Sequence, residues 1–287
     1  MYIVLGARGY IGSAIVNELK SRTLSYGALC RERVDYTSST IFGQYLDKTL
    51  KQGIKDLTII NCAGYVGKPN VDACEENKED CILGNVLFPS MLSNLCASRG
   101  VKLCHISSGC IYNGYEKDFS EEDVPNFTMN KGSFYSGTKA LAERILKNKP
   151  LTYIFRLRIP FDHIPSPRNY ITKLIDYKRL LNRRNSLSHR GDFAHYSLNL
   201  LEMKAPYGIY NITNKGHLNT SEITALIQES LLPNKQFHFF EKYRHFLKIT
   251  TAPRSNCILD TSKLESYMPV RSAQDSMEDA LSKYIMR

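Results

Sequence analysis

The chain has 287 residues, of which 43% are hydrophobic and 23% charged, a composition that is ordinary for a soluble protein with a sizeable buried core. No apolar run approaches the roughly 18–20 residues that span a bilayer, and no basic and apolar leader follows Met1, so the sequence predicts a cytoplasmic protein without a membrane partner. The formal net charge of +10 comes without a nucleic-acid motif, and the eight cysteines lack metal-ligand spacing, so we expect neither nucleic acid nor a bound metal.

In the first half of the chain, short apolar strands alternate with amphipathic helices, as in a parallel sheet that helices cover on both faces. The expected strands lie near Tyr2–Leu5, Leu24–Leu29, Leu57–Asn61, Val101–Ser107 and Leu151–Ile159. The expected helices lie near Ile11–Ser21, Asp72–Arg99 (with a break around Gly84) and Phe134–Leu146. After Pro160 the pattern changes. The later elements that we expect are a helix near Asn169–Leu181, a strand near Gly208–Ile212 and a helix that Thr220 caps and that runs to Leu231.

A glycine-rich segment follows the first expected strand and opens the first expected helix. It reads Gly6-Ala7-Arg8-Gly9-Tyr10-Ile11-Gly12. Glycine allows a tight turn and lets the backbone approach a pyrophosphate, which the helix N-terminus stabilises through its free N–H groups and its dipole. Because the segment lies between strand and helix at the start of a βαβ pattern, it predicts a dinucleotide site. The alternative is a purely structural turn.

The residues after the second expected strand indicate which dinucleotide binds. An NAD enzyme usually has Asp or Glu there for the ribose hydroxyls, whereas this chain has Cys30-Arg31-Glu32-Arg33. Arg8, with Arg31 or Arg33, could grip a 2′-phosphate, so we expect NADPH/NADP+ rather than NADH. After the third expected strand, Asn61-Cys62-Ala63-Gly64 resembles the segment that passes under the adenine in short-chain dehydrogenases.

These patterns together predict an α/β fold, a Rossmann-type doubly wound parallel sheet with a smaller C-terminal substrate lobe. We expect residues 1–160 to form the NADP(H)-binding Rossmann domain. Residues 161–287 would form mainly the substrate-binding lobe, with some segments returning to the Rossmann sheet.

Candidate catalytic residues follow in Tyr135-Ser136-Gly137-Thr138-Lys139, which places Tyr135 and Lys139 one helical turn apart on one face. A free phenol has a pKa of about 10 and is a poor proton shuttle at neutral pH unless a nearby cation favours its ionised form. Lys139 can supply that charge and also hold the nicotinamide ribose. A Tyr–Lys pair alone is commonplace, but Ser108 ends the fourth expected strand at the right place to hydrogen-bond a substrate carbonyl. The three residues therefore predict the catalytic triad of a short-chain dehydrogenase.

Longer segments resemble the UDP-rhamnose synthase family, the bifunctional UDP-4-keto-6-deoxyglucose 3,5-epimerase/4-reductases of plants and some large viruses. Relatives of that family include dTDP-4-dehydrorhamnose reductase. The matching segments, in order, are Gly67-Lys68-Pro69-Asn70-Val71-Asp72, Ser108-Gly109-Cys110-Ile111, Pro125-Asn126-Phe127, Gly132-Ser133-Phe134-Tyr135, Pro167-Arg168-Asn169-Tyr170-Ile171-Thr172-Lys173 and Ala252-Pro253-Arg254-Ser255-Asn256. The related 4,6-dehydratases carry Asp-Glu where this chain has Gly109-Cys110, so dehydratase activity is not expected.

The resemblance implies an enzyme in which Cys110 and Lys173 form an epimerase acid/base pair. It also implies that Arg168, Asn169 and Arg254 contact the substrate, with Arg254 on the diphosphate. The expected substrate is UDP-4-keto-6-deoxyglucose, which a separate 4,6-dehydratase would supply. Relatives often form homodimers, so the resemblance is compatible with a homodimer, and the sequence leaves the oligomeric state open.

Two alternatives are open at this point. The chain could be a 4-reductase only, fed by a separate epimerase, although Cys110 with Lys173 argues against that reading. It could instead be a non-catalytic dinucleotide-binding subunit that regulates a partner enzyme, although the presence of Ser108, Tyr135 and Lys139 argues against it. The non-catalytic interpretation of Cys110 is that it is simply a buried apolar thiol.

Overall fold

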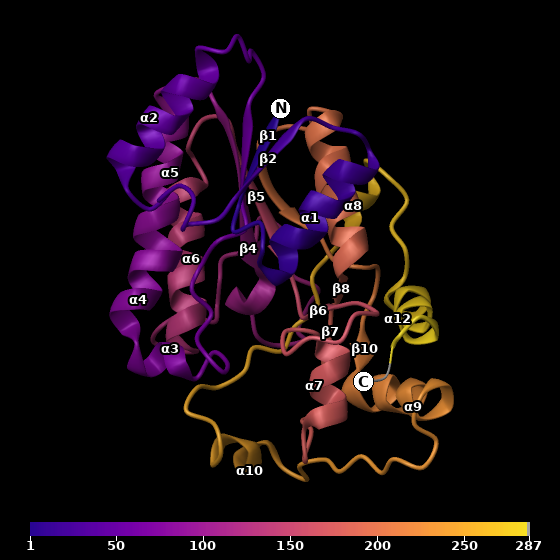
Figure 1. The fold of residues 1–287 in the computed structure, drawn as a ribbon. Coiled ribbons are helices and arrows are strands. Elements are labelled where there is room, and N and C mark those ends of the chain that lie inside the picture. Colours follow the sequence, from indigo (N-terminus) through magenta and orange to yellow (C-terminus); the bar gives the residue numbers. More distant parts are fainter. Residues whose placement is uncertain (286–287) are drawn as a thin grey trace.

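The computed structural model describes residues 1–285 and has a six-stranded parallel sheet at its centre (Figure 1). The strand order is β2-β1-β3-β4-β5-β9, and every neighbouring pair is parallel. The strands are β1 (Tyr2–Leu5), β2 (Tyr26–Leu29), β3 (Thr58–Asn61), β4 (Lys102–Ser108), β5 (Thr152–Leu157) and β9 (Gly208–Asn211). The predicted Rossmann-type α/β fold is confirmed.

Helices cover both faces of the sheet, and each face has its own hydrophobic core (Figure 1). Helices α1 (Tyr10–Ser21) and α8 (Arg190–Glu202) pack on one face, with Ile15 and Leu198 fully buried. Helices α2 (Ser39–Leu50) and α5 (Phe88–Ala97) pack on the other, beside α6 (Phe134–Leu146). Because both faces are covered, the strands are largely buried and rich in apolar residues, which explains why they could be predicted from the sequence.

The helix expected over residues 72–99 is divided, and the predicted break around Gly84 is confirmed. It consists of α3 (Ala73–Glu76), α4 (Lys78–Ile82), a π-helical turn η1 (Leu83–Leu87) and α5. A Cβ atom at Gly84 would lie 3.0 Å from the Cβ of Tyr65, so glycine allows the loop after β3 to pass close to this turn. Asn85 fixes the same loop, since its amide donates to the Tyr65 carbonyl at 2.8 Å and accepts from the Tyr65 N–H.

Several elements did not follow from the sequence patterns. Helices α2, α8 and α12 (Ala273–Ser282) were not expected, nor were the short strands. Those strands are β6 (Pro160–Phe161) with β8 (Ser188–His189), and β7 (Arg184–Asn185) with β10 (Leu218–Asn219). Two-residue strands have no periodicity to detect, because each is defined only by its partner.

Helices of the second lobe begin and end at other residues than expected. Helix α7 (Tyr170–Asp176) stops well before Leu181, because Tyr177 takes an extended conformation. Helix α9 (Thr220–Ser230) is capped by Asn219 and not by Thr220, since Asn219 and Glu222 form a reciprocal capping box. Two short helices follow, α10 (Tyr243–Leu247) and α11 (Ser262–Glu265). No helix within residues 1–285 is long and apolar enough to cross a bilayer.

Candidate active site

The turn after β1 has the shape of a dinucleotide cradle. Gly6 has a φ of +69°, and a Cβ atom at Gly12 would lie 2.2 Å from the Gly6 carbonyl oxygen, so both positions require glycine. Helix α1 begins after Gly9 without a side-chain cap, which leaves the N–H groups of its first turn for an anion. Tyr10 and Ile11 are the first two residues of that helix. This turn fits the pyrophosphate of a dinucleotide.

At the end of β2 lies a cavity of about 190 Å³. It is lined by Ala7, Arg8, Val16, Ala28, Leu29, Cys30 and Arg33. Arg8 and Arg33 thus share the cavity, whereas Arg31 is exposed and does not line it. The Arg8 Nη1 atom is 3.9 Å from Glu32 Oε2, and the two side chains are 79% and 76% exposed. Such an exposed ion pair is weak, so Glu32 leaves both cavity arginines available to a 2′-phosphate.

The segment after β3 packs against the glycine turn. A Cβ atom at Gly6 would approach the Ala63 nitrogen to 3.0 Å, and the Ala63 N–H donates to Asn61 Oδ1 at 3.0 Å. Burial raises the pKa of the Cys62 thiol to about 12, which keeps it neutral. Gly64 is exposed at the end of this segment. The residues predicted to pass under the adenine therefore lie directly beside the pyrophosphate turn.

The Arg33→Ser variant is expected to lose preference for NADPH. We expect its KM for NADPH to rise about 10-fold while its KM for NADH stays close to that of the unmodified protein, because one charge-assisted contact with the 2′-phosphate disappears. Steady-state reduction with each cofactor measures both values. Arg31→Ser is the matched control, since Arg31 lies outside the cavity. Equal rises for both cofactors would contradict the assignment of Arg33 to the 2′-phosphate.

Helix α6 and strand β4 bring the predicted triad together. Ser133 caps α6 by accepting the Ser136 N–H at 3.1 Å, which places Tyr135 and Lys139 on the first turns of the helix. Ser108 is the last residue of β4. Burial raises the pKa of the Tyr135 phenol, nearby Cys110 raises it further, and a hydrogen bond with Ser108 acts in the opposite direction. Burial therefore favours the protonated phenol, with the Ser108 hydroxyl as its neighbour.

Lys139 is a buried cation at the base of this site. Its side chain is 6% exposed, and its ammonium group donates to the Ile106 carbonyl oxygen at 3.0 Å. Burial lowers the pKa of Lys139 to about 8, while the negative charge of Glu143 acts in the opposite direction. The lysine can thus exchange its proton near neutral pH, as a proton relay requires.

Cys110 and Lys173, which are distant in sequence, lie near enough in the fold to interact electrostatically. Cys110 lies in a 3-10 turn (Gly109–Ile111) directly after β4, where its N–H donates to Ser108 Oγ at 3.2 Å. Lys173 lies in the first turns of α7. Burial lowers the pKa of Lys173, the charges of Arg168 and Arg254 lower it further, and Cys110 opposes them. Cys110 therefore interacts electrostatically with Lys173 as well as with Tyr135 and Lys139.

The residues expected to contact substrate form hydrogen bonds within the protein that the sequence did not indicate. Arg168 donates to the Gly67 carbonyl at 3.1 Å. Both terminal nitrogens of Arg254 lie 2.8 Å from the Asp72 carboxylate, so the fork predicted to hold a diphosphate is occupied by an acidic side chain. Asn169 is fully buried and caps α7, accepting the Ile171 N–H at 3.0 Å. Direct contact between Asn169 and substrate is therefore not available in this structure, and the residue instead holds the helix that carries Lys173.

Asp162 links the first residue of α1, beside the glycine turn, to the start of helix α7. Nothing in the sequence pattern singled this residue out. The carboxylate accepts from the Tyr10 phenol at 3.0 Å, from Asn169 at 3.0 Å and from the Arg190 guanidinium at 2.7 Å. Asp162 is 2% exposed. These three side chains come from α1, the cap of α7 and α8, so only the folded chain places them around one carboxylate.

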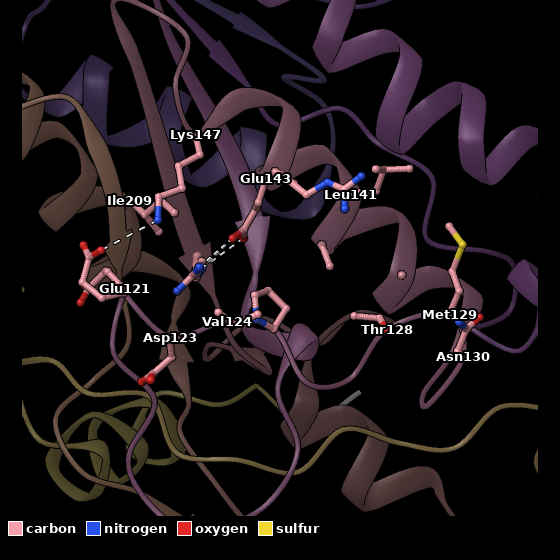
Figure 2. Close-up of a pocket in the computed structure, with 16 residues that line it drawn as sticks. Glu121, Asp123, Val124, Thr128, Met129, Asn130, Leu141, Glu143, Lys147 and Ile209 are labelled. Atoms are coloured by element: carbon pink, nitrogen blue, oxygen red, sulfur yellow. Dashed lines mark hydrogen bonds and ion pairs between the residues drawn. The ribbon is translucent and has the colours of Figure 1, made fainter.

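A larger cavity, of about 560 Å³, lies away from these residues, between α6 and the loop before it (Figure 2). Glu121, Asp123 and Val124 of the loop line it, together with Leu141 of α6 and Lys147, which directly follows that helix. None of the residues predicted to bind cofactor or substrate lines it. Size alone would thus have pointed away from the predicted site residues.

Comparison with known proteins gives concordant results. The family model described as the RmlD substrate binding domain matches residues 1–286. A bifunctional dTDP-4-dehydrorhamnose 3,5-epimerase/dTDP-4-dehydrorhamnose reductase of Arabidopsis thaliana is 30% identical, over 99% of this chain and 92% of its own length. A trifunctional UDP-glucose 4,6-dehydratase/UDP-4-keto-6-deoxy-D-glucose 3,5-epimerase/UDP-4-keto-L-rhamnose-reductase of the same plant is 31% identical over 99% of this chain, which spans only 41% of that protein.

Among solved structures, the L780 UDP-rhamnose synthase from Acanthamoeba polyphaga mimivirus superposes with a TM-score of 0.88. The identity is 25%, and the match covers 98% of both chains. The predicted resemblance is confirmed along nearly the whole sequence, from the glycine turn to the C-terminal helix. The chain therefore belongs to the RmlD substrate binding domain family and is related to the bifunctional epimerase/reductases of plants and a giant virus.

Proposed function

We propose that this enzyme converts UDP-4-keto-6-deoxyglucose to UDP-L-rhamnose by 3,5-epimerisation followed by NADPH-dependent reduction of the 4-keto group. The observation that supports the proposal is the electrostatic proximity of Cys110 to residues of two sets. Ser108, Tyr135 and Lys139 form the set suited to carbonyl reduction, and Cys110 with Lys173 forms the set suited to proton exchange at carbon. The names of the Arabidopsis and mimivirus relatives support both halves.

In the reduction, bound NADPH supplies the hydride that C4 of the sugar accepts. Ser108 donates a hydrogen bond to the carbonyl oxygen and Tyr135 gives it a proton, which the protonated form favoured by burial carries. The Lys139 ammonium then stabilises the phenolate that forms, and the lowered pKa of Lys139 allows the proton to be replaced from solvent.

In the epimerisation, the C4 carbonyl acidifies the protons on C3 and C5, so side chains of moderate basicity suffice. Inversion at each carbon needs one group to remove a proton and another to return one to the opposite face. Cys110 comes from the turn after β4 and Lys173 from α7, so the two groups approach the sugar from different elements. A separate 4,6-dehydratase must supply the substrate, because Gly109 and Cys110 stand where the dehydratases have Asp and Glu.

Product analysis in deuterated water tests the whole proposal. The purified protein is incubated with UDP-4-keto-6-deoxyglucose and NADPH, and the product is examined by NMR. UDP-L-rhamnose with deuterium at C3 and C5 is the expected product. A sugar reduced at C4 without deuterium at those carbons would leave a 4-reductase only. No consumption of NADPH would favour the non-catalytic, regulatory reading.

The Cys110→Ala variant is expected to separate the two activities. Deuterium incorporation at C3 and C5 should fall about 10²–10⁴-fold, because a group that transfers the proton is missing. Reduction of UDP-4-keto-L-rhamnose, prepared with a separate epimerase, should continue at close to the unmodified rate. Cys30→Ala is the matched control, since Cys30 lies at the other end of the cofactor site. Retained deuterium incorporation in Cys110→Ala would remove Cys110 from the acid/base pair.

A further inference from the structure

Arg158 is a fully buried cation directly behind Cys110. It is 0% exposed, and its Nη1 atom lies 3.5 Å from Cys110 Sγ. The same guanidinium group donates to the hydroxyl of Ser255 at 3.1 Å, to the Ser255 carbonyl at 2.7 Å and to the Asn185 amide oxygen. Its Nε atom is buried with no hydrogen-bond partner. No hydrogen-bond partner of this cation is a carboxylate.

Arg156, two residues earlier, differs in having a negatively charged partner. Arg156 is just as buried, at 1% exposed, but the Glu143 carboxylate neutralises it at 2.7 Å. Within residues 1–285, no Asp or Glu forms an ion pair with Arg158. A guanidinium group keeps its charge even when buried, so an uncompensated one is costly unless an anion comes to it. The group in contact with it that can become an anion is the thiol of Cys110.

The turn that carries Cys110 is shaped to make this contact. A Cβ atom at Gly109 would lie 3.4 Å from Arg158 Cδ and 2.6 Å from Leu259 Cδ1, so glycine lets the turn lie against the arginine. The other titratable groups around the thiol come from several elements. They are Tyr135 and Lys139 of α6, Lys173 of α7 and Cys257. Burial raises the pKa of Cys257, which donates to the Gly109 carbonyl and is thus a neutral neighbour.

We propose that Arg158 is a positioning residue that holds Cys110 as a thiolate, and that this thiolate is the base of the epimerisation. The inference rests on the proposed function. The thiolate removes a proton from C5 or C3, so the C–H bond breaks, an S–H bond forms and the electron pair moves to the C4 oxygen as an enolate. Lys173 as an ammonium group returns a proton to the opposite face, and both residues then re-equilibrate with water. The guanidinium group itself transfers no proton.

Two substitutions at Arg158 separate its charge from its hydrogen bonds. Arg158→Gln keeps an N–H donor without the charge, and Arg158→Lys keeps the charge without the planar fork. Deuterium exchange at C3 and C5 of UDP-4-keto-6-deoxyglucose is measured without NADPH. For Arg158→Gln we expect the exchange rate to fall about 10–100-fold, because an adjacent opposite charge shifts the pKa of an ionisable group by about 1–3 units. Arg158→Lys should recover most of that loss.

Reduction of UDP-4-keto-L-rhamnose is the internal control for both variants, because it needs neither the thiolate nor Lys173. It should change less than about 3-fold, showing that the fold and the cofactor site are intact. Equal losses in exchange and in reduction would make Arg158 merely structural and overturn the inference. If the unmodified enzyme exchanges no deuterium at all, the epimerase function fails before Arg158 is tested.

Thiol alkylation gives a second readout that does not depend on turnover. The rate of iodoacetamide modification of Cys110, followed by mass spectrometry as a function of pH, reports its thiolate fraction. The midpoint in the folded, unmodified protein should lie below that in the urea-unfolded chain, and in Arg158→Gln it should move up by about 1 pH unit or more. If Arg158→Gln does not fold, the comparison of folded with unfolded chain still decides: equal midpoints would overturn the inference.

Discussion

The Tyr135→Phe variant is expected to lose reductase activity by about 10²–10⁴-fold in kcat, the range for removal of a general acid. The phenol neighbours Ser108, and burial raises its pKa, which favours the protonated form that the proposed transfer to the C4 oxygen requires. Phenylalanine keeps the ring and removes only the hydroxyl. Consumption of NADPH with UDP-4-keto-L-rhamnose as the substrate measures the loss directly.

The same variant should continue to exchange deuterium at C3 and C5 when NADPH is left out, because we assign that step to Cys110 and Lys173 in the proposed function. Tyr177→Phe is a suitable control, since Tyr177 is 51% exposed just beyond α7. A Tyr135→Phe enzyme that reduces at the unmodified rate would show that another group protonates O4, and Lys139 would be the next residue to test.

Replacing Glu143 with Gln is expected to lower the free energy of unfolding by about 3–5 kcal/mol, because it leaves a buried arginine without its anion. Glu143 and Arg156 are 3% and 1% exposed and are joined by contacts of 2.7, 3.0 and 3.1 Å. Ser107 also donates to the same carboxylate at 2.5 Å. The pair ties α6 to β4 and β5 beside the large cavity in Figure 2, and urea denaturation measures the change.

The double variant Glu143→Met/Arg156→Met should recover much of that stability, since replacing both partners by apolar side chains removes the uncompensated charge. Asp47→Asn is the control for loss of an ion pair at the surface, since Asp47 is 50% exposed and pairs with Arg99. The urea midpoint of the Asp47→Asn protein should stay near that of the unmodified protein. A Glu143→Gln protein as stable as the unmodified one would show that Arg156 reaches water.

The comparison of Arg156 with Arg158 explains why Glu143→Gln tests stability whereas Arg158→Gln tests the proposed epimerisation. Both guanidinium groups are buried at the end of β5, yet one has a permanent carboxylate partner and the other has a thiol that is neutral or anionic depending on pH. The first pair therefore contributes to stability, and its carboxylate also raises the pKa of the nearby Lys139. The second couples a buried charge to the state of a residue proposed to react with substrate.

Much of the fold and of the cofactor site could be predicted from the sequence, because the responsible patterns are local. The glycine turn follows directly from β1, Tyr135 and Lys139 are one helical turn apart, and the apolar strands are continuous runs. A backbone conformation or a helix face is decided by residues within a few positions of one another. For the same reason, the break at Gly84 was visible, whereas Thr220 was mistaken for the cap that the adjacent Asn219 provides.

Only the tertiary structure decided how distant segments meet. Cys110 and Arg158 are 48 residues apart, and Asp72 and Arg254 are 182 apart, so no periodicity connects them. The family resemblance predicted roles for Arg254 and Asn169, but the folded chain pairs Arg254 with Asp72 and buries Asn169 as a helix cap. Contacts of this kind depend on how the second lobe packs against the carboxyl ends of the parallel strands, and that packing depends on the complementary shapes of all the layers together.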